Sequence, residues 1–296
     1  MRRVLLGNHG QFANNFVLAV DAFDVDALAY IQRVETADGT ALEAGIKSII
    51  NSFVIGCKAD GIWDAIKSSA ILAGARTLNG ALQPLVGVAP TNFNFVSGDY
   101  DRKTGLVGNG TTKYLDSNRN TNADPQDSYS ASVWISSAGT PANSIQLFIG
   151  ANSTLDGTTS LGMAFSQLFA RNRSLGFSSF GTSTATGFFG HSRNNSATYT
   201  TRNGGANTPI TQASQAPANS ATHVFAETGT AIYRSNSRLA FYSIGESLDL
   251  ALLDTRVTNL INHYKFFLYT AANPLDYDPD TVLYVNRAYD AGGTLA

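Results

Sequence analysis

One pattern dominates the sequence from residue 93 to residue 238: short runs rich in Thr, Ser and aromatic residues alternate with turn formers. The runs include SYSASVWIS, SIQLFIGAN and TGFFGHSRN, and the turns include Asp156-Gly157 and Asn203-Gly204-Gly205. A spacing of roughly 8–12 residues is typical of the strands of an antiparallel β-sandwich or jelly roll. We therefore expect a mainly β chain, with the sandwich and a closing helix at residues 93–265.

The residues before the sandwich carry a helical period instead. Apolar residues recur at helical spacing within residues 26–39, 41–61 and 62–75, and Asp24 stands where a helix N-cap is expected. These three stretches predict three short helices. Residues 76–92 contain two prolines and several small residues, which favours a crossover connection. We therefore expect residues 24–92 to form a helical segment and crossover.

The end of the sequence predicts one more strand and one more helix. Residues 239–244 have the composition of a strand, and Glu246-Ser247 is the predicted start of a helix that runs to about residue 265. Residues 1–23 and 266–296 show no long helical period. We expect both to be extended arms that attach the chain to neighbouring subunits.

The stretch from Gly105 to Ser136 contains the strongest short-range turn signal of the chain. Asn109-Gly110 is the dipeptide most typical of a two-residue β-hairpin, so it predicts a hairpin. Tyr114 and Leu115 then fall on opposite faces of the following strand. One of the two is expected in the core and the other at the surface.

Charge and cysteine content exclude several functional classes. The formal net charge is −2 and no basic run occurs, so we expect no nucleic-acid binding. Cys57 is the one cysteine, which excludes an internal disulfide and a cysteine-based zinc site, and its apolar neighbours predict a buried thiol. No run of about 18 apolar residues occurs, so no membrane span is expected. Asn8 and His9 interrupt the apolar N-terminus, so we do not expect a signal peptide.

The sequence lacks the residue patterns of common hydrolases. Glu227 is the only Glu between residues 93 and 240, and its alternate neighbours are not acidic, so no strand carries a pair of carboxylates for glycoside hydrolysis. The four histidines are far apart, and no G-x-S-x-G motif occurs. We expect a non-enzymatic protein without a cofactor.

Two groups of residues remain as candidates for binding. Calcium prefers several oxygen ligands, and the metal candidates are Asp116, Asp124 and Asp127; the alternative is that these aspartates lie in solvated loops. Glycan binding uses aromatic faces beside polar side chains, and the alternative is that the candidates belong to the core or to a solvated surface. The glycan candidates are two aromatic residues, Trp134 and Tyr199, and a polar rim of arginines at the strand ends, Arg171, Arg173, Arg193 and Arg202.

Two longer stretches resemble a known family. TNFNFVSGDYDRKTGLVGNGTTKYLDSNRN and LAFYSIGESLDLALLDTRVTNLIN are similar to the concanavalin A-like, laminin-G-type jelly rolls of bacteriophage virion proteins, and the resemblance spans residues 24–265. It implies a structural protein at the virion surface, in a tail fibre, baseplate or head fibre, that contacts host-surface glycans.

The same resemblance implies partners. Other virion proteins would bind the two arms, and the chain would form a homo-oligomer, with a trimer favoured. The alternative is a capsid decoration, or cement, protein with no ligand, in which the sandwich is a spacer.

Overall fold

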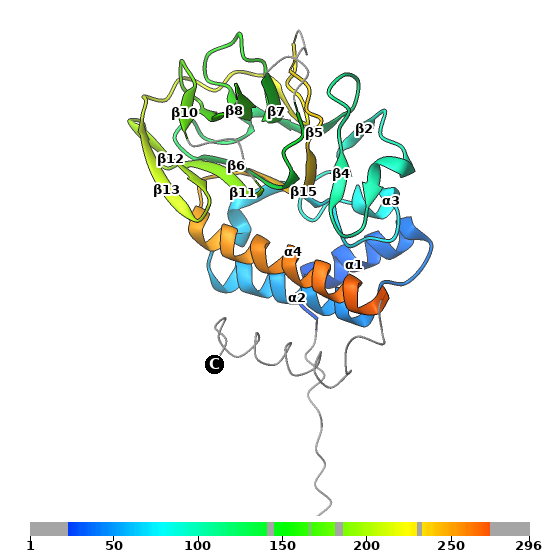
Figure 1. The fold of residues 1–296 in the computed structure, drawn as a ribbon. Coiled ribbons are helices and arrows are strands. Elements are labelled where there is room, and N and C mark those ends of the chain that lie inside the picture. The colour runs from blue at the N-terminus through cyan, green and yellow to red at the C-terminus, as the bar shows by residue number, and fades with distance from the viewer. Residues whose placement is uncertain (1–22, 141–144, 166, 181–185, 230–232, 273–296) are drawn as a thin grey trace, which may run out of the picture.

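The computed structural model describes residues 23–140, 145–165, 167–180, 186–229 and 233–272. Two antiparallel sheets face each other in these residues, and helices cover the outer face of one of them (Figure 1). The predicted antiparallel sandwich of jelly-roll type is confirmed. The predicted N-terminal arm up to residue 22, and residues 273–296 of the predicted C-terminal arm, lie outside the described residues.

The first sheet, which lies next to the helices, has the strand order β13-β12-β11-β6-β15-β4-β3, and β1 pairs with β15 beside β4. All of its pairs are antiparallel. Its strands are β1 (Ile66–Ile71), β3 (Tyr100–Asp101), β4 (Gly105–Val107), β6 (Tyr129–Ser137), β11 (Gly187–Arg193), β12 (Thr198–Asn203), β13 (Ala206–Thr211) and β15 (Arg238–Gly245).

The second sheet has the order β10-β9-β8-β7-β14-β5-β2. Side chains from both inner faces form one core, in which the rings of Phe148 and Phe189 meet edge to face with their centroids 6.3 Å apart. The strands of this sheet are β2 (Thr91–Phe93), β5 (Tyr114–Asn120), β7 (Ile145–Gly150), β8 (Thr159–Ala164), β9 (Gln167–Asn172), β10 (Ser178–Phe180) and β14 (Ala221–Val224).

The helices form where the sequence supplies caps and apolar stripes. The Asp24 side chain caps α1 (Val25–Asp38) by accepting a hydrogen bond from the Asp26 backbone N–H (2.9 Å), and Gly39 ends the helix in the left-handed conformation. The predicted buried thiol is confirmed: Cys57 lies on the buried face of α2 (Ala44–Ala59), and burial raises its pKa to about 12. The remaining helices are α3 (Leu78–Ala81), α4 (Leu250–Ala272) and the 3-10 turns Trp63–Ala65, Ser97–Asp99 and Thr121–Ala123.

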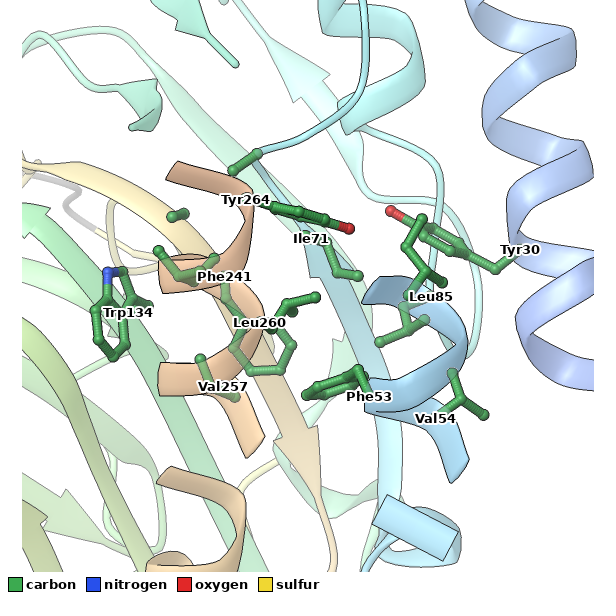
Figure 2. Close-up of a cluster of buried hydrophobic side chains, with 14 of the residues drawn as sticks. Tyr30, Phe53, Val54, Ile71, Leu85, Trp134, Phe241, Val257, Leu260 and Tyr264 are labelled. Atoms are coloured by element: carbon green, nitrogen blue, oxygen red, sulfur yellow. The ribbon is translucent and has the colours of Figure 1, made fainter. Parts of the chain in front are cut away.

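A second core lies between the helices and the first sheet. Figures 1 and 2 show α2 and α4 side by side, with Phe53 of α2, Val257 and Leu260 of α4 and Phe241 of β15 directed toward one another. The rings of Phe53 and Phe241 are 6.0 Å apart. The outer face of the first sheet is therefore buried by helices, and the sandwich becomes a three-layer structure.

The prediction of a third helix at residues 62–75 was wrong. Residues 66–71 form β1, which pairs with residues 241–245 of β15. Ile66 and Ile71 pack toward the helices, whereas Ala70 packs between the two sheets. A strand buried on both faces reads as a continuous apolar run, and its period does not distinguish it from a short buried helix.

The predicted boundaries of the closing helix were also wrong. β15 reaches Gly245, and α4 begins only at Leu250, where Asp249 Oδ1 accepts a hydrogen bond from the Ala251 N–H (2.7 Å). The helix continues to Ala272, so the first seven residues of the predicted C-terminal arm are helical. No helix among the described residues is long and apolar enough to cross a membrane.

The predicted hairpin at Asn109-Gly110 was wrong as well. This turn leaves β4 in the first sheet and enters β5 in the second sheet, so it connects the two layers. Asn109 Oδ1 accepts hydrogen bonds from three successive backbone N–H groups, those of residues 111–113, at 2.9–3.0 Å. The hydrogen bonds of the turn are local, whereas the rest of the fold decides which strands pair with β4 and β5. Leu115 is buried and Tyr114 is half-buried on the outer face, as predicted.

Candidate functional site

Five of the six residues predicted to bind glycans are buried, including three of the four arginines of the predicted rim, which contradicts an exposed rim. Arg171, Arg173 and Arg193 are 2%, 0% and 0% exposed, and Trp134 and Tyr199 are 7% and 2% exposed. A guanidinium group carries five N–H donors, so it can satisfy several backbone carbonyl groups that the loops leave unpaired. The arginines that stand next to asparagines at the strand ends therefore do not form a rim. They act as structural clamps, by which we mean side chains that hold backbone segments together.

Arg193 shows how such a clamp works. It lies at the end of β11 and donates to the carbonyl oxygens of Asn172 (2.9 and 3.0 Å) and Gln212 (2.9 Å), and its guanidinium lies 5.3 Å from the centre of the Tyr199 ring. Asn172 belongs to the second sheet, so the contact ties the two sheets together. Burial lowers the pKa of Arg193. The Tyr199 hydroxyl donates to the Ala170 carbonyl (3.1 Å).

Arg173 is a second clamp. Its guanidinium lies 4.3 Å from the centre of the Tyr129 ring and donates to the carbonyl oxygens of Pro125 and Thr121. These contacts fix the connection between β5 and β6. Burial lowers the pKa of Arg173.

The three aspartates predicted as calcium ligands have different partners. Asp124 is buried and forms an ion pair with Arg119, and Asp127 accepts a hydrogen bond from Ser214 Oγ (2.5 Å). Asp116 accepts from the Asn118 backbone N–H (2.8 Å). In the part of the chain that the structure describes, no three His, Cys, Asp or Glu side chains lie close enough to share a metal ion. Calcium therefore stays a prediction without a ligand set among these residues.

An aromatic groove lies on the outer face of the second sheet, which no helix of the described residues covers (Figure 1). Its volume is about 390 Å³. We call this the aromatic groove; its lining residues are Ile145, Leu147, Ser153, Ala164, Phe165, Phe169, Phe177, Ser179 and Tyr233.

The floor of the aromatic groove follows from strand register. Leu147 of β7, Gly162 of β8 and Phe169 of β9 pair in one row across the sheet, so all three face outward. A Cβ atom at Gly162 would lie 2.6 Å from the Phe169 ring and 2.8 Å from Leu147 Cδ2. Glycine at this position therefore lets the two large side chains close over β8.

Two phenylalanines in the walls of the aromatic groove are unusually exposed for aromatic residues. Phe165 is 75% exposed at the tip between β8 and β9, and Phe177 is 46% exposed. The rings of Phe169 and Phe177 meet edge to face, 5.1 Å apart. Phe165 has φ of 46°, a left-handed conformation that is strained for a bulky residue. Because its ring is exposed and its backbone is strained, Phe165 is a candidate for contact with a ligand.

Polar groups converge at one end of the aromatic groove around Ser153. Its carbonyl oxygen accepts from Arg171 Nη1 (2.9 Å), and its backbone N–H donates to Glu227 Oε2 (3.0 Å). Arg171 also faces Asp156, with 3.5 Å between Nη2 and Oδ1. Burial raises the pKa of Glu227 and lowers the pKa of Arg171. The polar end therefore contains the Arg171 guanidinium near two carboxylates, and the backbone of Ser153 holds both Arg171 and Glu227 in place.

Among the predicted residues, Arg171 alone reaches the polar end of the aromatic groove. Phe165, Phe177, Tyr233 and Glu227 were not predicted as binding residues. Phe165 and Phe177 lie next to turns, and an aromatic residue at a turn was the signal that could have found them. The site as a whole offers ring faces for stacking and a fixed polar end for hydrogen bonds.

Comparison with known proteins gives no assignment by sequence: no protein-family model and no curated protein matches the chain. Several solved structures are partly similar. The binding domain of botulinum neurotoxin serotype D is 9% identical with a TM-score of 0.43, covering 69% of this chain and 52% of that one. A Trypanosoma rangeli sialidase is 9% identical with a TM-score of 0.47, covering 72% and 39%.

Domain 4 of an extracellular arabinanase from Geobacillus stearothermophilus is 14% identical with a TM-score of 0.37, covering 57% of this chain and 82% of that domain. The chain thus spans about half or less of the length of the first two structures. The fold class follows from the two sheets of this chain, and these similarities add no argument about its function.

Proposed function

We propose that this chain is a non-enzymatic structural protein of a bacteriophage virion, and that its sandwich binds glycans of the host surface through the aromatic groove. The exposure of Phe165 and Phe177 beside a fixed polar end is the observation that carries the glycan part. The virion part rests on the sequence resemblance over residues 24–265.

The chemistry of the aromatic groove suits a sugar ring. Sugars present an apolar face of C–H groups that stacks on aromatic rings, and hydroxyl groups that need hydrogen-bond partners at the edge. Phe165, Phe177 and Tyr233 supply rings. Ser153 and Ser179 supply hydroxyl groups within the lining. The Arg171 guanidinium is paired with Asp156 and lies near the buried Glu227, so the polar end offers no unpaired cation to an anionic ligand.

The test is a glycan array probed with the full chain, followed by affinity measurements on the best-bound glycan. We expect Phe177→Ala and Phe165→Ala each to weaken binding about tenfold, which corresponds to about 1.4 kcal/mol. Tyr269→Ala is the matched control, because Tyr269 is 48% exposed on α4, away from the aromatic groove. Absence of binding to every glycan, or equal binding by both groove variants and the parent chain, would contradict the proposal.

Particle assays separate adhesion from capsid decoration. If the chain is an adhesin, particles that carry Phe177→Ala should assemble normally and adsorb poorly to host cells. A cement protein gives the opposite result: particles without the chain would lose capsid stability, and the Phe177→Ala particles would adsorb like the parent.

A further inference from the structure

A second groove lies on the other sheet, between its outer face and α4. Its volume is about 410 Å³. We call it the tryptophan groove; it is lined by Trp134, Thr186, Gly187, Phe188, Gly204, Gly205, Asp254, Thr255, Thr258 and Asn259. It brings together two residues predicted as glycan ligands, because Trp134 is part of the lining and Arg202 binds the lining residue Asp254.

Glycines keep one side of the tryptophan groove open. Gly187 begins β11, and Gly204 and Gly205 form the turn between β12 and β13. A Cβ atom at any of the three would meet no heavy atom within 4 Å. All three have positive φ, which favours glycine over other residues. The backbone at this side is therefore exposed to the groove and offers its peptide groups to a ligand.

Four polar residues of α4 form the opposite side. Residues 254, 255, 258 and 259 lie on one face of the helix because they are separated by one, four and five positions. Asp254 accepts from Arg202 Nε (2.7 Å) and from Thr258 Oγ1 (2.9 Å). The charge of this aspartate is therefore balanced, and its carboxylate is held in one orientation.

Hydrogen-bonding groups remain unused at the tryptophan groove. Among the described residues, the Trp134 indole N–H has no acceptor although the side chain is only 7% exposed. The Asn259 side-chain amide, half-buried in the lining, likewise has no hydrogen-bond partner in the described part of the chain. The Asn259 amide lines the groove and is available to pair with a ligand. The Trp134 indole nitrogen is fully covered, so its missing partner is a cost of the fold and not a contact that a ligand in the groove can make.

We propose that the tryptophan groove is a second binding site, for one or two units of a neutral saccharide. The apolar Trp134 and Phe188 surfaces suit the C–H face of a sugar ring, and the amide, hydroxyl and backbone groups suit its hydroxyl groups. The Asp254 carboxylate and the Arg202 guanidinium are paired with each other, so neither is left unpaired for a charged ligand. A purely apolar ligand would leave the Asn259 amide unpaired. This site is formed by different residues on a different sheet, so the proposal does not depend on binding at the aromatic groove.

The intrinsic fluorescence of Trp134 provides a direct test. The chain contains two tryptophans, so Trp63→Phe leaves Trp134 as the only indole. The Trp63→Phe chain is titrated with a panel of free neutral monosaccharides and disaccharides: glucose, galactose, mannose, N-acetylglucosamine, N-acetylgalactosamine, lactose and maltose. We expect at least one member to change the fluorescence of Trp134 saturably.

Variants then assign the response to the groove. Thr255→Arg places a long side chain in the tryptophan groove from an exposed position of α4, and it should abolish the response. Asn262→Arg is the matched control, because it adds the same side chain at an exposed position two turns along α4, outside the groove, and should leave the response unchanged. Asn259→Ala, which removes no hydrogen bond of the described residues, should weaken binding at least fivefold and serves as the test if Thr255→Arg does not fold.

Three results would overturn the second site. The first is no saturable change with any sugar in the panel. The second is a response that survives both Thr255→Arg and Asn259→Ala. The third is a response lost in Phe177→Ala but retained in Thr255→Arg, which would place the sugar in the aromatic groove and leave the proposed function intact. Loss of glycan-array binding in Phe177→Ala with an unchanged Trp134 response would support both sites independently.

Discussion

The outer faces of the two sheets carry similar residues in opposite environments. On the first sheet, Trp134, Phe188 and Phe241 are 7%, 4% and 0% exposed, because α2 and α4 pack over them. On the second sheet, Phe165 and Phe177 at the strand ends are 75% and 46% exposed. The helices therefore cover nearly all of the aromatic surface of the first sheet and leave only its edge at the tryptophan groove. The aromatic residues at the open face of the second sheet keep about half or more of their surface in contact with solvent.

The largest expected effect is on the covered face. Phe241→Ala removes a fully buried ring that packs against Phe53. We expect the free energy of unfolding to fall by about 3–5 kcal/mol, the usual cost of a phenylalanine cavity in a core. Chemical denaturation of the full chain measures it.

The matched change on the open face is Phe177→Ala, which should cost only about 0.5–1.5 kcal/mol, because half of that ring is exposed and its main contact is the Phe169 ring. Equal losses for the two variants would mean that the two faces do not differ in the way described.

The next effect concerns the contacts that join the sheets. Arg193→Met keeps most of the side-chain volume but leaves the buried carbonyl oxygen of Asn172 and the part-buried carbonyl oxygen of Gln212 without their donor. We expect a loss of about 3 kcal/mol, since each unsatisfied buried acceptor costs about 1–3 kcal/mol. Arg76→Met is the control. Arg76 has a one-third exposed side chain, pairs with Glu43 and donates to the exposed carbonyl oxygen of Ala41, which water can reach, so its loss should stay below about 1 kcal/mol. A small effect at Arg193 would show that water replaces the guanidinium.

A pH-dependent effect is expected at the same junction. His191 of β11 is fully buried between the hydroxyl of Thr159 (3.1 Å) and the side-chain amide of Asn172 (2.6 Å), both in the second sheet. Burial lowers its pKa to about 3, so the folded chain holds a neutral imidazole while the unfolded chain takes up a proton below about pH 6.5. Stability should therefore fall as the pH drops from about 6.5 toward 3, by up to about 1.4 kcal/mol per pH unit.

Measuring the free energy of unfolding against pH for the parent chain and for His191→Gln isolates this contribution. Other groups, such as Glu227, titrate in both proteins, so only the difference between the two curves reports on His191. A difference that does not change with pH between 6.5 and 4 would refute the neutral buried histidine.

The smallest stability effect is expected at the tip of the open face. Phe165→Gly removes an exposed ring from a left-handed position that glycine adopts without strain. We expect the free energy of unfolding to change by less than about 1 kcal/mol. Glycan binding should nevertheless weaken as it does in Phe165→Ala. A large loss of stability would show that the ring belongs to the core and not to a contact surface.

The sequence was most informative where local chemistry decides the structure. Strand spacing predicted the sandwich, and Asp24 with the apolar stripe of residues 26–39 predicted α1. The sequence was misleading where an element is buried on two faces, as in β1, because an apolar run then carries no period of its own. It was also misleading at Asn109-Gly110, because a turn motif fixes the bend of the chain and not the partner of each flanking strand.

The candidate site was less predictable than the fold. Arginines at strand ends have the same sequence pattern whether they face solvent or donate hydrogen bonds to backbone carbonyl groups inside the fold. The structure shows the second case for Arg173 and Arg193. The aromatic groove required the pairing of Leu147, Gly162 and Phe169 across three strands, and strand register is a tertiary property.

By itself, the sequence determined that this chain forms short antiparallel strands around a large core, with helices before and after them, because spacing, caps and turn formers act over a few residues. Only the tertiary structure decided that α2 and α4 cover the first sheet and leave Phe165 and Phe177 of the second sheet exposed. The reason is that exposure depends on which apolar faces meet, and those faces come from segments as far apart as residues 53 and 241.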